Sequence, residues 1–155
     1  MPANAVVIDT NLLVLLIVGT ASPSYIARHK RLQAYTRQDF ELLTNYLSRA
    51  RRVVVTPNTV TETSNLAGYI AEPARSHIYR VLHAFLQTSE EVYVASKTAA
   101  GHAAFLRLGV ADAALLAMIG EDHMLLTADL DLYLEALGAG RETVNFNHYI
   151  EANRP

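Results

Sequence analysis

The sequence contains no cysteine, which excludes disulfide bonds, zinc-thiolate sites, iron–sulfur clusters and a cysteine nucleophile. It also lacks a long hydrophobic run. The longest, from Leu12 to Val18, is far shorter than the roughly 20 residues that a membrane-spanning helix needs. No lysine or arginine precedes this run, so it lacks the charge pattern of a secretory signal. These absences predict a cytoplasmic protein that has no membrane partner.

An overall excess of positive charge is also missing. The net charge of −2 argues against a protein that coats nucleic acid nonspecifically. The charge is nevertheless uneven, because residues 1–80 are net positive and residues 81–155 are net negative. Seven of the 13 lysine and arginine residues fall within residues 28–52, at Arg28, Lys30, Arg31, Arg37, Arg49, Arg51 and Arg52. These residues form either a surface that contacts phosphate groups of a nucleic acid or an ordinary solvated helix face.

The 155 residues, 51% of them hydrophobic and 18% charged, suit one globular domain covering residues 1–155. Short apolar runs predict strands at 5–8, 52–56 and 124–127, with weaker strand signals at 92–95 and 143–146. Helical spacing or capping signals predict helices at 11–18, from 36 and from 57 onward, and at 73–87, 96–109, 111–120 and 132–137. Strands that alternate with helices predict an α/β fold with a mainly parallel sheet.

Four carboxylates are expected at one edge of this sheet. Asp9 ends the first strand, Glu62 lies early in the helix after the second, Asp112 opens a later helix, and Asp129 follows the strand at 124–127. Each alone has an ordinary explanation, such as a helix cap or a turn. Together, at the carboxyl ends of parallel strands, they would repel one another unless cations lay among them. Carboxylate oxygens suit Mg²⁺ or Mn²⁺, so the pattern predicts a metal site.

The order of these motifs resembles the PIN-domain nucleases. The resemblance rests on Val7–Ile8–Asp9–Thr10–Asn11–Leu12–Leu13, on Pro57 followed by Glu62, on Val110–Ala111–Asp112–Ala113–Ala114–Leu115–Leu116–Ala117, and on Leu125–Leu126–Thr127–Ala128–Asp129. It spans nearly the whole chain. It implies a three-layer α/β/α sandwich whose acidic pocket holds Mg²⁺ or Mn²⁺ and hydrolyses phosphodiester bonds, usually of RNA.

The resemblance also implies roles for single residues. Asp9, Glu62, Asp112 and Asp129 correspond to the metal-binding catalytic acids, and Asn11 and Thr127 to polar residues that orient ligands or the scissile phosphate. Asp131 is a second carboxylate close to Asp129. The spacing from Thr127 favours Asp129 as the site residue, and Asp131 is expected to cap the following helix.

The resemblance further bears on partners. Toxin members of the family pair with an antitoxin protein, so an antitoxin and a second copy of this chain are candidate partners beside RNA. The segment between Asp9 and Glu62 is longer than in the compact toxins, which predicts a basic helical insertion at about 20–52. The alternative function is an inactive PIN fold that binds RNA or protein. The presence of all four acids favours catalysis. Uncompensated carboxylates in a pocket are energetically costly, and a protein that only binds RNA or protein has no use for them.

Overall fold

Five parallel strands form one sheet in the order β3-β2-β1-β4-β5. The structure is a computed structural model that describes residues 5–154. The strands are β1 (Ala5–Ile8), β2 (Arg52–Val55), β3 (Glu90–Glu91), β4 (His123–Thr127) and β5 (Thr143–Asn145). Because all five run in one direction, the residues that follow them collect at a single edge of the sheet.

The central strand β1 is buried on both faces, as its uninterrupted run of apolar residues predicts. Val6 and Ile8 point into one hydrophobic core, which the long helix α1 shares. Ala5 and Val7 point into a second core on the opposite face. This alternation places the sheet between two apolar layers.

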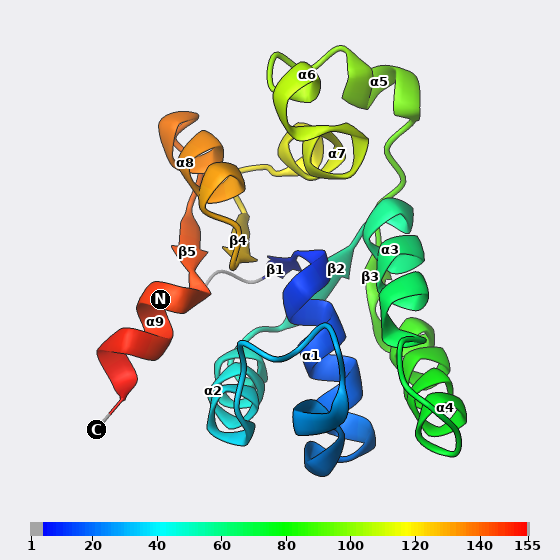
Figure 1. The fold of residues 1–155 in the computed structure, drawn as a ribbon. Helices are drawn as coiled ribbons and strands as arrows, with labels where there is room; N and C mark the ends of the chain where they lie inside the picture. The colour runs from blue at the N-terminus through cyan, green and yellow to red at the C-terminus, as the bar shows by residue number, and fades with distance from the viewer. Residues whose placement is uncertain (1–4, 155) are drawn as a thin grey trace.

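Helices flank both faces of the sheet (Figure 1). One side carries α1 (Thr10–Ala21), the 3₁₀ helix η1 (Pro23–Arg28), α2 (Arg37–Ser48), α3 (Pro57–Ala67), α4 (Ala74–Thr88) and α9 (Phe146–Asn153). The other side carries α5 (Ser96–Ala100), α6 (Phe105–Leu108), α7 (Val110–Met118) and α8 (Leu130–Gly138). The predicted α/β class with a parallel sheet is confirmed. Among residues 5–154, no helix combines the length and the apolar character that crossing a membrane requires.

Two predicted helix starts are confirmed in atomic detail. Thr36 and Asp39 form a capping box at the start of α2, in which each side chain accepts a hydrogen bond from the other residue's backbone N–H. Thr56 caps α3 and Pro57 occupies its first turn. The second signal fixes where α3 begins and therefore where Glu62 lies.

The predicted strand at 92–95 is wrong. The pairing with β2 falls on Glu90 and Glu91 and ends with the backbone N–H of Val92, which donates to the carbonyl of Val55 at 2.9 Å. Beyond that bond the chain leaves the sheet, and Val94 packs against α5 and α7. The apolar signal at 92–95 therefore comes partly from Val94 packing against helices, while Tyr93 is exposed, and over so short a run this pattern resembles a strand.

The predicted single helix at 96–109 is divided, and one helix was not predicted. Gly101 ends α5, and the ring Nδ1 of His102 accepts the backbone N–H of Ala104, which makes a turn before α6. Helix α9 follows β5 directly because the side chain of Asn145 accepts the backbone N–H groups of Asn147 and His148.

Candidate functional site

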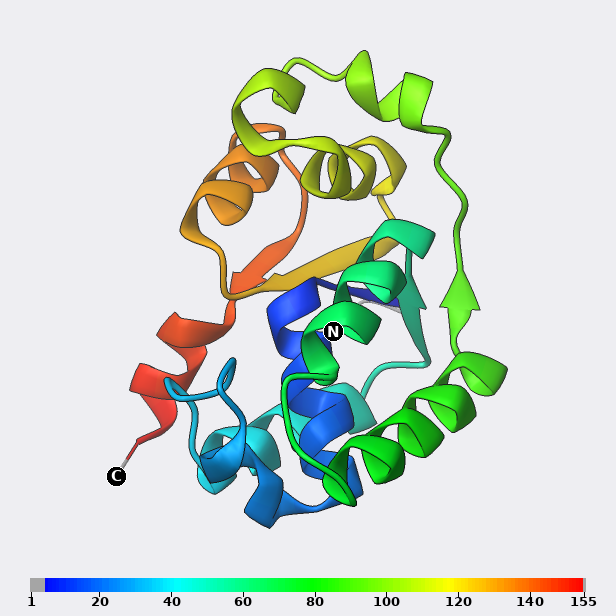
Figure 2. The same cartoon turned by 45° about the vertical axis from the view of Figure 1, so that its right-hand side comes forward.

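A cavity of about 340 Å³ lies at the carboxyl edge of the sheet, between the first turns of α1 and α7 and one face of α3. Four carboxylates line it, at Asp9, Glu62, Asp112 and Asp129. Figure 2 shows α3 and the start of α1 in front of the sheet, with α7 above them. The structure therefore brings together the four acids that the sequence analysis selected from four separate segments.

Asp9 is the most tightly held of the four, and only 5% of its surface is exposed. It caps α1, since its Oδ1 accepts the backbone N–H of Leu12 at 3.2 Å. Its Oδ2 accepts both the hydroxyl of Thr127 and the backbone N–H of Ala128. Burial raises the pKa of Asp9, and these hydrogen bonds act in the opposite direction. The side chain is thus fixed in place by three donors.

Thr127 does not line the cavity, although it was expected to orient a ligand. Its side chain is fully buried. Its hydroxyl donates to Asp9 and accepts the backbone N–H of Asp129 at 2.9 Å. Thr127 therefore positions two of the acids relative to each other.

Asp129 lines the cavity, whereas Asp131 does not. Asp129 also caps α8, because its Oδ1 accepts the backbone N–H of Leu132 at 3.0 Å. The expectation that Asp131 caps this helix is wrong, since Asp131 lies in the first turn of α8 and is exposed. Asp129, two positions after β4, both lines the cavity and caps α8. The sequence alone does not distinguish these two roles.

The pKa of the Asp112 carboxyl group is raised to about 7. Burial is the largest cause, followed by the negative charges of Asp129, Asp9 and Glu62. Asp112 lies in the first turn of α7, and Gly109, with a φ of 85°, immediately precedes this helix. The carboxyl group is thus held among three others that it repels.

The two remaining predicted residues are more exposed. Glu62 projects from α3, and its Oε2 accepts the hydroxyl of Thr10 at 3.3 Å. Asn11 lines the cavity from the first turn of α1. Thr10 also lines the cavity and was not selected from the sequence, although its place between Asp9 and Asn11 could have indicated it.

The donor chemistry suits a hard divalent cation, because the cavity offers carboxylate oxygens and an amide. The hydrogen bonds to Asp9 and Asp129 leave further lone pairs on their oxygens. In residues 5–154, however, no three acidic or histidine side chains lie close enough to form a ready-made metal-binding group. Binding of a metal would therefore require at least one of the four acids to move from its position in this structure.

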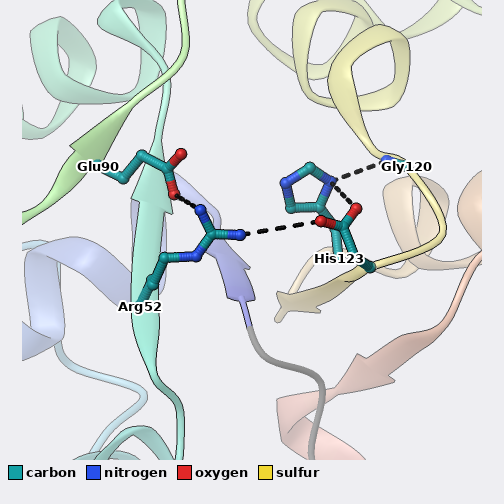
Figure 3. Close-up of polar contacts among 5 residues, drawn as sticks. Arg52, Glu90, Gly120 and His123 are labelled. Atoms are coloured by element: carbon teal, nitrogen blue, oxygen red, sulfur yellow. Dashed lines mark hydrogen bonds and ion pairs between the residues drawn. The ribbon is translucent and has the colours of Figure 1, made fainter.

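The predicted basic residues are scattered. Arg52 lies at the opposite, amino-terminal edge of the sheet, where its guanidinium pairs with Glu90 at 2.8 Å and with Asp122 at 3.8 Å (Figure 3). Arg49 lies near the same edge, in a hollow lined by Val6 and Met124. These two arginines do not reach the acidic cavity.

Arg31 is the exception, because it lines the acidic cavity. Its neighbour Lys30 is exposed, and the guanidinium of Arg28 lies 5.5 Å from the centre of the Tyr25 ring. Arg51 is exposed next to the start of β2. The basic segment therefore contributes a single side chain to the cavity lining.

Neither protein-family profiles nor curated proteins give a match to this sequence. The interpretation of the site therefore depends on its geometry and on the residues that form it.

Proposed function

We propose that this chain is a Mg²⁺- or Mn²⁺-dependent ribonuclease of the PIN-domain type. The observation that carries the proposal is the cavity in which Asp9, Glu62, Asp112 and Asp129 meet at the carboxyl edge of a parallel sheet. The strand order 3-2-1-4-5 is consistent with a PIN-like fold, and the four acids occur in the order that the resemblance requires.

A cation is favoured because the four carboxylates have little else to offset their charge. The pKa of Asp112 is raised by three like charges, and no cation opposes them among the causes of this shift. A structural role alone would not need this repulsion, since neutral residues would pack at lower cost. When bound, a divalent ion would activate the attacking water and stabilise the charge that develops on the leaving oxygen.

The residues of the chain divide the remaining work. Asp9 and Asp129, each held by backbone N–H groups, would supply fixed oxygen ligands. Asp112 and Glu62 would complete the ligand set by rotation, and Asn11 would donate its amide N–H to a phosphate oxygen at the cavity mouth. In the reaction, the water oxygen bonds to phosphorus and the P–O3′ bond breaks. One RNA product then carries a 5′-phosphate and the other a 3′-hydroxyl.

The test is a cleavage assay on a labelled single-stranded RNA with the purified full chain. We expect cleavage with Mn²⁺ or Mg²⁺, none with EDTA, and loss of cleavage in Asp112→Asn. The product ends are read by their sensitivity to phosphatase and to 3′ ligation. Cleavage that persists in EDTA, or that yields 2′,3′-cyclic phosphate, would contradict the proposal. RNA binding without any cleavage would favour an inactive binding module.

A further inference from the structure

The turn that follows η1 is pinned to α3 by a buried histidine. His29 is fully buried. Its ring Nε2 lies 3.2 Å from the backbone carbonyl of Ala67, at the end of α3, and its Nδ1 lies 3.1 Å from the backbone nitrogen of Arg31. A carbonyl only accepts and a backbone N–H only donates, so the ring must be neutral with its proton on Nε2. His29 thus links Arg31 to the helix that carries Glu62.

Further bonds fix this turn on both sides of Arg31. The side-chain amide of Gln33 donates to the carbonyl of His29 at 2.8 Å. Leu32 is buried in the main core, and its backbone N–H donates to the carbonyl of His29 at 3.1 Å. Arg31 therefore lies on a turn held by the buried residues His29 and Leu32, and its own side chain is exposed.

The guanidinium of Arg31 is available to a ligand. Across the described part of the chain, no Asp or Glu oxygen lies within ion-pairing distance of it. It lines the same cavity as the four acids. Two other arginines of the basic segment are paired, Arg37 with Glu41 and Arg52 with Glu90.

We propose that Arg31 binds a backbone phosphate of the RNA at the mouth of the acidic cavity, and that His29 is its positioning residue. This inference rests on the proposed function, and it assigns the phosphate-binding role to one arginine of the basic segment. A cavity lined by four carboxylates repels a polyanion, so an RNA strand needs a cation at its rim. A planar guanidinium can donate two parallel hydrogen bonds to one phosphate. These bonds would orient the RNA strand as well as attract it.

The first test measures RNA affinity by fluorescence anisotropy over a series of salt concentrations. Arg31→Gln is compared with Arg80→Gln, an exposed arginine on α4, both in an Asp112→Asn background that suppresses cleavage. We expect Arg31→Gln to weaken binding roughly tenfold, the scale of one charged hydrogen-bonded contact. It should also lower the log–log salt slope by about 0.7. Arg80→Gln should change neither quantity.

The second test separates positioning from folding. In His29→Gln the amide can still donate to Ala67, but no acceptor remains for the backbone N–H of Arg31. In His29→Asn the side-chain oxygen lies near the former Nδ1 and retains that acceptor. We expect His29→Gln to weaken RNA binding more than His29→Asn does. Adding His29→Gln to Arg31→Gln should weaken binding no further. A purely structural histidine would lower the melting temperature in both variants and leave their RNA affinities equal.

The results distinguish this inference from the proposed function. Loss of affinity in Arg31→Gln supports the inference, and cleavage by the unmodified chain in Mn²⁺ is measured separately. If Arg31→Gln and Arg80→Gln bind RNA with the same affinity and salt slope, the inference is overturned. When the unmodified chain still cleaves RNA in that case, the proposed function survives and the phosphate contact lies elsewhere.

Discussion

At the scale of single residues, Asp9 and Asp112 differ in how far hydrogen bonds compensate their negative charge. Asp9 accepts hydrogen bonds through both oxygens, so its negative charge is partly compensated. Asp112 faces three like charges, and its pKa is raised to about 7. The folded state therefore holds a proton on Asp112 more tightly than the unfolded state does, and stability falls as pH rises from about 4 toward 7.

Asp112→Asn should consequently stabilise the metal-free protein at pH 8. We expect a gain of about 1 to 2 kcal/mol in the free energy of unfolding, after allowing for the partial exposure of the group. The measurement is urea denaturation in EDTA, with Asp131→Asn as the control because Asp131 lies outside the cavity. A loss of stability in Asp112→Asn would show that the carboxylate is favourably paired in the metal-free fold.

Asp9→Asn should have the opposite effect on stability. An asparagine keeps one acceptor oxygen, but its NH₂ group would face a backbone N–H, either of Leu12 or of Ala128. One buried donor then loses its partner, at a cost of about 1 to 3 kcal/mol. The same urea experiment measures it, and an unchanged midpoint would mean that the side chain has rotated to recover both bonds.

His29 makes a separate contribution to the pH dependence of stability. Burial lowers its pKa below the usual value of 6.5, and the positive charge of Arg31 acts in the same direction. The folded state therefore binds this proton less readily than the unfolded state does, so stability falls as pH drops below about 6.5.

The check is thermal denaturation at pH 7.5 and at pH 5.5. The drop in melting temperature should be smaller in His29→Asn than in the unmodified chain, because the variant has no imidazole to protonate at this position. Equal drops in the two proteins would mean that His29 titrates alike in the folded and unfolded states.

At the scale of elements, the start of α7 decides where Asp112 lies. Gly109 precedes the helix with a φ of 85° and a ψ of 179°. Residues that carry a Cβ atom rarely adopt this backbone conformation. No atom lies within 4 Å of the position that a Cβ would take, so any cost of a substitution comes from the backbone alone.

Gly109→Ala should therefore destabilise the protein by roughly 1 to 3 kcal/mol. It should also reduce cleavage, because a changed backbone at Gly109 moves the first turn of α7 and Asp112 with it. Gly138→Ala, at the end of α8, is the matched control, since its backbone is ordinary and its Cβ meets no atom. If both variants have the same melting temperature and activity, the conformation at Gly109 does not position the site.

The helices and strands differ in how far the sequence predicts them. Strands β1, β2 and β4 were predictable because each contains an uninterrupted apolar run that a polar residue follows. The division between α5 and α6 was not, because it depends on a turn in which a histidine ring accepts a backbone N–H. Both residues of β3 are glutamates, which have a low propensity to form strands. They pair because β2 offers a free edge of the sheet, and the sequence of β3 alone does not predict this pairing.

At the scale of the whole molecule, the topology explains why the four acids could be selected in advance. Parallel strands deliver their following residues to one edge, so order along the chain is enough to predict a shared cavity. No comparable rule predicts where the basic residues lie in the fold. Arg52, on β2, pairs with Glu90 of the neighbouring strand β3 and with Asp122 just before β4, and no local sequence pattern predicts these contacts.

Binding of a divalent ion should stabilise the folded molecule, since only the folded chain brings the four acids together. At a Mn²⁺ concentration 100 times the dissociation constant we expect a melting temperature higher by roughly 5 to 10 °C. The measurement is thermal denaturation with and without Mn²⁺. Asp129→Asn should show a much smaller shift, and an equal shift in that variant would place the bound ion outside the cavity.

The central claim is that the cavity acids, and not acidic residues in general, carry out metal-dependent RNA cleavage. The most direct measurement compares the Mn²⁺-dependent cleavage rates of Asp129→Asn and Asp131→Asn, which remove the same charge two positions apart on the chain. Only Asp129 lines the cavity. We predict that Asp129→Asn loses cleavage and that Asp131→Asn retains the rate of the unmodified chain. Equal rates in the two variants would contradict the account.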